Sequence, residues 1–187
     1  GFTEAGRDIY IEDSVYQAVY SAGDVALRDA MDLAYLTGQR PADVLALTES
    51  DIKNGEVCIQ QNKTSKKLRI TIQGELATLI DRITKRKSIL SLKSINLVIT
   101  ENGSGLTRGA LRSRFDKARE LAAKTHPELA SSITAFQFRD LRAKAGTDKA
   151  ESAGDIRQAQ KQLGHSSVKM TEQYVRDRKG DKVGPTR

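Results

Sequence analysis

Hydrophobic residues recur at helical spacing over most of this chain and alternate with polar residues in only one short stretch. The first strong helical pattern runs from Asp24 to Leu36, with Asp24 as its N-cap. Thr37-Gly38 ends this helix, and Pro41 suits the first turn of the next one. Further helical patterns lie at residues 76–83, 111–122, 140–150 and 155–163, and a last helix opens at Ser166 or Ser167.

The alternating stretch begins at Glu56, runs to Ile59, and resumes from Leu68 to Ile72 after a polar loop. Two alternating runs joined in this way predict a β-hairpin. The short apolar run Leu97–Thr100 is expected to add a third strand to the same small sheet. The fold class expected is therefore α+β: mainly α-helical, with a small antiparallel sheet.

The charge of the chain favours a polyanionic partner. Lysine and arginine total 31 against 24 acidic residues, which gives a net charge of +7 and a pI near 9.5. A charge of this size is also ordinary for a small soluble domain. Composition alone therefore leaves two classes open, a nucleic-acid-binding protein and a merely basic soluble one.

Cysteine content and hydropathy exclude several other classes. The single cysteine, Cys58, cannot form an internal disulfide, and no Cys/His cluster has metal-ligand spacing. No stretch approaches the roughly 18 apolar residues that cross a bilayer, and the amino terminus lacks the profile of a signal peptide. We expect a cytoplasmic protein without a metal site.

Four clusters of polar residues carry the chemistry. They are Thr37-Gly38-Gln39-Arg40, the hairpin loop Asn62–Lys67, Arg139-Asp140-Leu141-Arg142, and Leu163-Gly164-His165 with Tyr174 nine residues later. In this order they resemble the tyrosine recombinase family and its phage integrases, which combine an arginine, a hairpin lysine, His-x-x-Arg, Leu-Gly-His and a nucleophilic tyrosine. The resemblance spans about Asp13 to Arg176, nearly the whole chain.

The resemblance implies the fold of the recombinase catalytic domain and site-specific DNA recombination. DNA strands would be cut and rejoined through a covalent 3′-phosphotyrosyl intermediate, with no metal, ATP or other cofactor, to integrate or excise a phage or genomic-island element. The partners implied are double-stranded DNA at attachment sites, a homotetramer on that DNA, and accessory DNA-bending or excision factors. The protein would associate with the bacterial nucleoid during the reaction.

The resemblance also divides the chain. Residues 1–12 are expected to end a linker from an amino-terminal DNA-binding region, since the opening Gly-Phe-Thr-Glu-Ala-Gly has no initiator Met. Residues 13–176 would form the catalytic domain. Residues 177–187 would form a polar tail, which family members exchange between protomers.

Phosphodiester cleavage explains why such residues would be assembled. Attack at phosphorus builds negative charge on the non-bridging oxygens, and the fixed N–H fork of a guanidinium suits that charge better than an ammonium does. Arg40 and Arg142 match the two family arginines, and Tyr174 matches the nucleophile. A tyrosine is ionised on the order of one part in a thousand at pH 7, so clustered positive charge would help it. The other tyrosines are expected to be packed, with satisfied hydroxyls; they are Tyr10, Tyr16, Tyr20 and Tyr35.

Lys63 and His165 match the proton-transfer positions of the family. Lys63 would protonate the leaving 5′ oxygen, and Lys66 and Lys67 are rivals for that role that could instead contact DNA phosphates. His165 would hydrogen-bond a phosphate oxygen or assist proton transfer. Its place at a helix start favours an anion there.

Two further positions match less directly. Arg139 stands where the family has histidine, and arginine cannot accept a proton at neutral pH, so a role in stabilising phosphate charge is expected. Asp43 matches an acidic position that would orient an active-site arginine or lysine, although pairing with the helix amino terminus is an equal alternative. Further DNA contacts, mostly to phosphates, are expected from Arg108, Arg112 and Arg114 on the helix after Thr107.

Two other functions stay open at this point. A type IB topoisomerase shares the arginine, lysine and tyrosine chemistry but would relax supercoils as a monomer, without paired sites. A non-catalytic DNA-binding module that kept the fold is the second alternative, for which Arg139 is the only indication.

Overall fold

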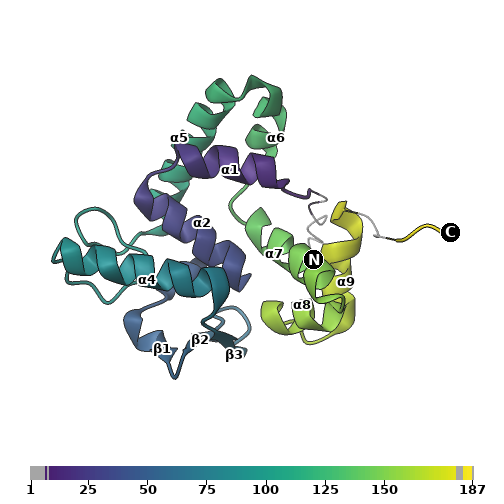
Figure 1. The fold of residues 1–187 in the computed structure, drawn as a ribbon, viewed down its shortest axis with the longest axis horizontal. Coiled ribbons are helices and arrows are strands. Elements are labelled where there is room, and N and C mark those ends of the chain that lie inside the picture. Colours follow the sequence, from purple (N-terminus) through teal and green to yellow (C-terminus); the bar gives the residue numbers. More distant parts are fainter. Residues whose placement is uncertain (1–6, 8, 180–182, 187) are drawn as a thin grey trace.

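The computed structural model describes residue 7, residues 9–179 and residues 183–186, and for residues 173, 174 and 176–179 it describes the backbone only. Helices dominate this part of the chain (Figure 1). The α-helices are α1 (Asp13–Ala22), α2 (Val25–Thr37), α3 (Pro41–Ala46), α4 (Gly74–Ile89), α5 (Arg108–Thr125), α6 (Ala130–Ala135), α7 (Asp140–Ala153), α8 (Ile156–Leu163) and α9 (Val168–Lys179). Two 3₁₀ turns, η1 (Glu49–Asp51) and η2 (Pro127–Leu129), and three strands, β1 (Ile52–Lys53), β2 (Glu56–Gln60) and β3 (Lys67–Thr71), complete the described elements.

The three strands form one antiparallel sheet in the order β1-β2-β3. The predicted hairpin is confirmed, with Val57 and Ile59 buried on its inner face. The prediction of a strand at Leu97–Thr100 is wrong, because the third strand is β1. Leu97, Val98 and Ile99 are buried, but the segment makes only isolated bridges. The Leu97 amide donates to the carbonyl of Leu47, and the Leu106 amide donates to that of Val98.

Helix α2 lies at the centre of the core and packs against α1, α4 and α7. Its residues Leu27, Met31 and Leu33 are fully buried. Figure 1 shows three groups around it: α1 with α5 and α6, α4 with the sheet, and α7 with α8 and α9. The hairpin and α7–α9 therefore approach the carboxyl end of α2 from two sides.

The expected corner after α2 is confirmed. The Asp24 side chain caps the helix by accepting a hydrogen bond from the Leu27 amide at 2.9 Å. Gly38 ends α2 in the left-handed region at φ +68°, and Pro41 opens α3. This local sequence makes Arg40 the N-cap of α3.

Among the described residues, none of the helices has both the length and the apolar character that crossing a membrane requires.

Candidate active site

Arg40 lies at the corner between α2 and α3 and is partly buried. Its Nη1 is buried and has no hydrogen-bond partner among the described residues. No described carboxylate forms an ion pair with it either. A buried donor without a partner costs about 1–3 kcal/mol. Fold stability therefore does not explain the place of this guanidinium.

Arg142, on α7, is 4% exposed and fixed by two backbone carbonyls. Its Nη1 donates to the carbonyl of Gly38 at 2.8 Å, and its Nη2 donates to the carbonyl of Leu163 at 2.6 Å. Both carbonyls lie at carboxyl ends of helices, α2 and α8, where a cation is favoured. Arg142 thus joins the Arg40 corner to the segment that leads into His165.

His165 follows Gly164 at the end of α8 and is 6% exposed. Its Nδ1 shares a 2.8 Å hydrogen bond with the hydroxyl of Thr171, a fully buried residue of α9. Burial, the nearby charge of Arg142 and then that of Arg40 lower the pKa of His165 to about 4. The imidazole is neutral at pH 7, and both guanidinium groups lie close enough to influence it.

This electrostatic arrangement predicts the titration of His165. We expect its imidazole to titrate near pH 4 in the free protein. The midpoint should rise when vanadate is added, because an oxyanion between the two arginines offsets their repulsion of a protonated ring. Imidazole ¹⁵N chemical shifts of the His126→Gln variant, which retains only one histidine, measure both midpoints. A midpoint near 6.5 in the free protein would contradict this environment.

The lowered pKa of His165 also makes the stability of the fold depend on pH. An unfolded histidine has a pKa of about 6.5, so the unfolded chain binds the proton that the folded chain excludes. The contribution of the neutral ring is therefore fully present above pH 6.5 and is lost as the pH falls towards 4. The loss should be absent from His165→Gln.

Tyr174 lies in α9, and its side chain is outside the part of the chain that the structure describes. The helix packs against α7 and α8, which carry Arg142 and the approach to His165. Tyr174 follows Thr171 by three residues, so the two positions lie on the same face of the helix. The contact between Thr171 and His165 brings that face to the site.

The other four tyrosines are packed, as predicted. Asp32 accepts hydrogen bonds from the hydroxyls of Tyr16 and Tyr20, and Asp148 accepts from those of Tyr10 and Tyr35. Burial, together with these carboxylates, raises the pKa of all four phenols. Since the phenolate is the stronger nucleophile, these tyrosines are poor candidates for attack on phosphorus.

Lys63 and Lys66 lie exposed in the loop between β2 and β3, whereas Lys67, expected in the loop, is the exposed first residue of β3. Asp43 fixes the loop, because its Oδ1 accepts a hydrogen bond from the backbone amide of Asn62 at 2.9 Å. Asp43 thus orients the lysine loop through its backbone. None of the described contacts joins the Lys63 ammonium to Arg40, Arg142 or His165.

Arg139 is exposed at the N-cap of α7, and its Nε donates to the side chain of Gln137 at 2.8 Å. Its neighbour Asp140 is committed elsewhere, since its carboxylate accepts hydrogen bonds from Arg7 and from the Gln137 amide. The structure places Arg139 one helical turn from Arg142. The backbone amide of Arg142 donates to the carbonyl of Arg139 at 3.3 Å.

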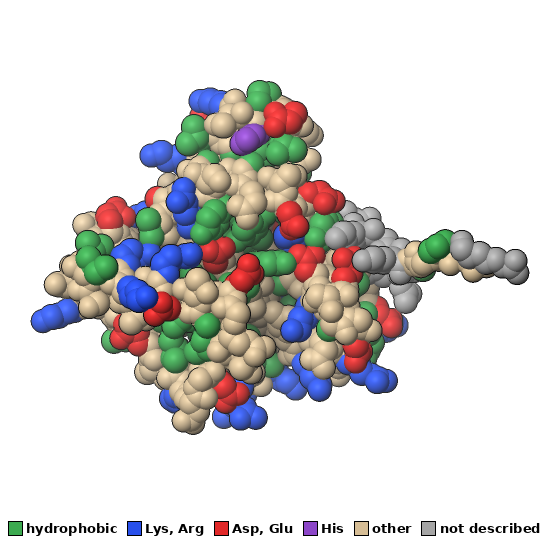
Figure 2. All heavy atoms as spheres, viewed as in Figure 1, with side chains coloured by type: hydrophobic (Ala, Val, Ile, Leu, Met, Phe, Trp, Pro, Cys, Tyr) green, Lys and Arg blue, Asp and Glu red, His purple; other side chains and the backbone are tan. Residues whose placement is uncertain are grey.

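The three arginines expected to contact DNA differ in their surroundings. Arg108 is exposed, and Arg112 is exposed beside Asp116 at 3.9 Å. Arg114 is partly buried and forms ion pairs with Asp24 at 2.7 Å and Glu101 at 3.3 Å. On the face drawn in Figure 2, basic and acidic side chains are interspersed. Basic ones are numerous along the margin where Figure 1 places the hairpin and α8.

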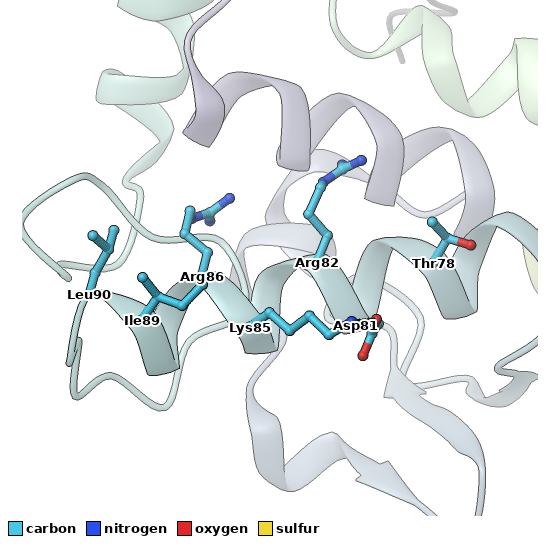
Figure 3. A pocket seen from close by; sticks show the side chains of 7 residues that line it. All are labelled: Thr78, Asp81, Arg82, Lys85, Arg86, Ile89 and Leu90. Carbon is cyan, nitrogen blue, oxygen red and sulfur yellow. Dashed lines mark ion pairs between the residues drawn. The ribbon is translucent and has the colours of Figure 1, made fainter.

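A separate open groove follows α4 from Thr78 to Leu90 (Figure 3). Its arginines, Arg82 and Arg86, point towards α2 and form ion pairs with Asp29 at 3.4 and 2.6 Å. These groups hold α4 to the core. None of the residues that line the groove belongs to the site around Arg40 and Arg142.

Sequence reasoning missed three residues that shape the site: Gln39, Gln61 and Thr171. All are at most 1% exposed. Gln39 lies inside the motif that ends at Arg40, and Thr171 precedes Tyr174 by one helical turn, so position in the motifs was an available signal. The burial of these side chains could not be predicted from the sequence, because polar side chains usually face solvent.

Gly164 allows the close approach of the loop to α8. It has φ +71°, and a Cβ atom there would lie 2.8 Å from Nε2 of Gln61. Gly154 has nearly the same φ, +65°, but its Cβ would meet nothing within 4 Å. We expect Gly154→Ala to lower the free energy of unfolding by about 1 kcal/mol and Gly164→Ala to lower it by about 2–4 kcal/mol. Urea denaturation measures both; equal losses would contradict the tight contact.

Comparison with known proteins gives concordant matches. The sequence model of the phage integrase family matches residues 12–180. The integrase of Escherichia phage HK022 is 31% identical over 177 residues, which cover 90% of this chain and 47% of that protein. The tyrosine recombinase XerC of Bifidobacterium longum (strain DJO10A) is 26% identical over 149 residues, which cover 78% of this chain and 41% of that protein.

The fold is also found in solved structures. A lambda integrase tetramer bound to a Holliday junction matches with a TM-score of 0.77 at 24% identity, over 97% of this chain and 52% of that one. The fold class predicted from periodicity is thereby confirmed. The chain spans about half the length of the curated relatives that it matches.

Proposed function

The chain belongs to the phage integrase family, and on that premise we propose that it acts as a tyrosine-type recombinase that cuts and rejoins duplex DNA at specific sites. The observation that carries the proposal is the meeting of Arg40, Arg142 and a neutral His165 beside α9. The buried Nη1 of Arg40, which has no partner among the described residues, is a donor suited to a phosphate oxygen.

In the proposed reaction the hydroxyl of Tyr174 attacks a backbone phosphorus. A bond forms between the tyrosine oxygen and the 3′-phosphate, and the bond from phosphorus to the 5′ oxygen breaks. Arg40 and Arg142 stabilise the charge on the non-bridging oxygens. The phenolic proton passes to the neutral imidazole of His165, whose pKa the bound phosphate raises.

Lys63 gives its proton to the leaving 5′ oxygen, so no bare alkoxide is expelled. Arg139 adds positive charge at the amino end of α7. The reverse steps, with a new 5′ hydroxyl as the attacking group, rejoin the strand without ATP or a metal. Asp43 positions the loop of Lys63 through the amide of Asn62.

For the protein as a whole, we propose integration or excision of a phage or genomic-island element, because the relatives include phage integrases. The substrate would be double-stranded attachment sites in the bacterial cytoplasm, with the enzyme at the nucleoid during reaction and accessory DNA-bending or excision factors beside it. A homotetramer on the DNA is proposed because lambda integrase forms one on a Holliday junction. Residues 13–176 would be the catalytic unit, between a linker (1–12) and a tail (177–187).

DNA contacts outside the reacting phosphate would come from Lys66, Lys67, Arg108 and Arg112, mostly to phosphates. Arg114 is the weakest candidate because Asp24 and Glu101 already pair with it. Binding through phosphates should weaken as salt rises, since each contact releases counterions.

A covalent trap tests the proposal. The protein is incubated in EDTA with a nicked suicide substrate that carries its attachment site, and the products are separated on a denaturing gel. A protein–DNA adduct, with a nucleotide mass on the tryptic peptide that contains Tyr174, is expected. DNA binding without any adduct would overturn the proposal in favour of a DNA-binding module, and relaxation of supercoils without strand exchange between paired sites would indicate a topoisomerase.

A further inference from the structure

Two buried glutamines, Gln39 and Gln61, lie where the segments carrying the proposed catalytic residues meet. We propose that Gln61, held by Gln39, is a positioning residue: it locks the hairpin loop that carries Lys63 onto the backbone that carries Arg40 and His165. This inference rests on the proposed function for its chemical consequence, although its structural part can be tested without DNA.

Gln39 sits next to Arg40 and is 1% exposed. Its Nε2 donates to the carbonyls of Thr37 and Gln162, both at 2.8 Å. Its Oε1 accepts a hydrogen bond from Nε2 of Gln61 at 2.9 Å. Because its two amide hydrogens face carbonyl oxygens, the oxygen of Gln39 must face Gln61, and the orientation of the amide is determined.

Gln61 makes the matching set of contacts from the hairpin loop and is also 1% exposed. Its Nε2 donates to Oε1 of Gln39 and, at 3.0 Å, to the carbonyl of Leu163. Its Oε1 accepts from the hydroxyl of Thr64 at 2.7 Å. Its backbone closes the loop, since its amide donates to Lys66 and its carbonyl accepts from Ser65, each at 2.8 Å.

The carbonyl of Leu163 receives two donors, Nε2 of Gln61 and Nη2 of Arg142. It lies two residues before His165, while Gln61 lies two residues before Lys63 and Gln39 immediately precedes Arg40. The amide pair therefore joins three segments, each at the last buried residue before a proposed catalytic residue. These catalytic residues are Arg40, Lys63 and His165. Gly164 is what allows this approach, because any Cβ there would collide with the Gln61 amide.

The directional character of the pair separates it from ordinary packing. Apolar side chains of similar volume could fill the same space, but they would leave the Leu163 carbonyl and the loop free to slide past one another. Hydrogen bonds between buried amides and carbonyls hold both distance and angle. Lys63 is exposed, so its reach to the leaving oxygen depends on where its loop is fixed.

The test compares Gln61→Met, which keeps the length of the side chain and removes its hydrogen bonds, with Gln60→Met, an exposed glutamine one residue away. Each protein is given the suicide substrate with either a normal 5′ oxygen or a bridging 5′ sulfur at the cleaved bond. A thiolate leaves without protonation, so the sulfur substrate does not need the proton from Lys63. Lys63→Ala serves as the reference for a lost proton donor.

We expect Gln61→Met to bind DNA as the parent protein does but to cleave the oxygen substrate about 10- to 100-fold more slowly, since a displacement of about 1 Å costs that much. On the sulfur substrate its rate should return to within about threefold of the parent rate, as for Lys63→Ala. Gln60→Met should match the parent on both substrates. Equal slowing on both substrates, or no slowing on the oxygen substrate, would overturn the inference.

Hydrogen exchange separates the inference from the proposed function. In Gln61→Met, without DNA, the amides of Asn62 and Ser65 should exchange faster than in Gln60→Met, because the loop is no longer held to α8. Unchanged exchange would overturn the positioning role whatever the enzyme does. If exchange is faster in Gln61→Met but the parent protein forms no adduct, the positioning role of Gln61 is supported and the proposed reaction is overturned.

Discussion

Tyr174→Phe is expected to lower the rate of covalent adduct formation by at least about 10⁴-fold while changing DNA affinity by no more than about threefold. The substitution removes a single oxygen, the atom proposed to bond to phosphorus, and leaves the charges of Arg40, Arg142 and Lys63 in place. Affinity should persist because phosphate contacts carry most of the binding free energy. Single-turnover cleavage of the suicide substrate and a parallel binding titration measure the two quantities.

Tyr20→Phe is the matched control for this experiment. The Tyr20 hydroxyl donates to Asp32, and burial raises the pKa of its phenol, so its removal should leave adduct formation within about twofold. Thermal stability should fall slightly, by the worth of one hydrogen bond, about 1 kcal/mol. An adduct that persisted in Tyr174→Phe would exclude Tyr174 as the nucleophile, and an adduct that vanished in Tyr20→Phe would contradict the purely structural role of Tyr20.

Local pattern was sufficient to predict most of the fold. The helical period from Asp24, the cap at that residue, the stop at Gly38 and the restart at Pro41 are encoded within a few residues of one another. The alternation at Val57 and Ile59 likewise predicts a strand with one buried face. In such segments the period of the side chains decides the element, and the tertiary structure agrees with it.

The third strand could not be predicted in the same way. Leu97–Ile99 is apolar, β-prone and buried, but the backbone of Leu97–Thr100 bonds to Leu47, Gly103, Ser104 and Leu106, and not to a neighbouring strand over several residues. The strand that does pair, β1, has only two residues, Ile52 and Lys53, too few to show a period. Pairing of so short a strand follows from the turn at Gly55 that brings it beside β2.

In the candidate site, too, some residues could be predicted from the sequence and others could not. Motif order brought out Arg40, Arg142 and His165, which the fold does bring together. The amides that hold them were missed because their partners are distant: Gln61 meets Leu163 across 102 residues, and Gln39 meets Gln162 across 123. Glutamine carries no periodic or motif signal of burial, so only the folded chain reveals these contacts.

The two arginines are expected to respond differently to the same substitution. Arg40→Met should lower the rate of adduct formation by about 10³-fold and leave the free energy of unfolding unchanged or up to about 1 kcal/mol higher. Arg142→Met should lower the rate by a similar factor and also lower the free energy of unfolding by about 3 kcal/mol. Both side chains would hold phosphate charge, but only Arg142 also holds the fold.

The contrast follows from their partners. Arg142 supplies donors to the carbonyls of Gly38 and Leu163, and its loss leaves the buried carbonyl of Gly38 without that charged donor. Arg40 has a buried Nη1 that satisfies nothing among the described residues, so its removal takes away an unfavourable group. Each substitution also removes a positive charge near His165, so the pKa of that imidazole should rise from about 4 in both variants.

Urea denaturation at pH 7, single-turnover cleavage and the ¹⁵N titration of His165 measure the three consequences on one pair of proteins. If the buried Nη1 of Arg40 destabilises the fold but binds a substrate oxygen, the protein gives up stability for activity at this position. Arg40→Met tests this, because its free energy of unfolding should stay the same or rise while its rate of adduct formation falls. A loss of several kcal/mol in Arg40→Met would make Arg40 a structural residue of the α2–α3 corner, and the phosphate site would then have to be built from Arg142 alone.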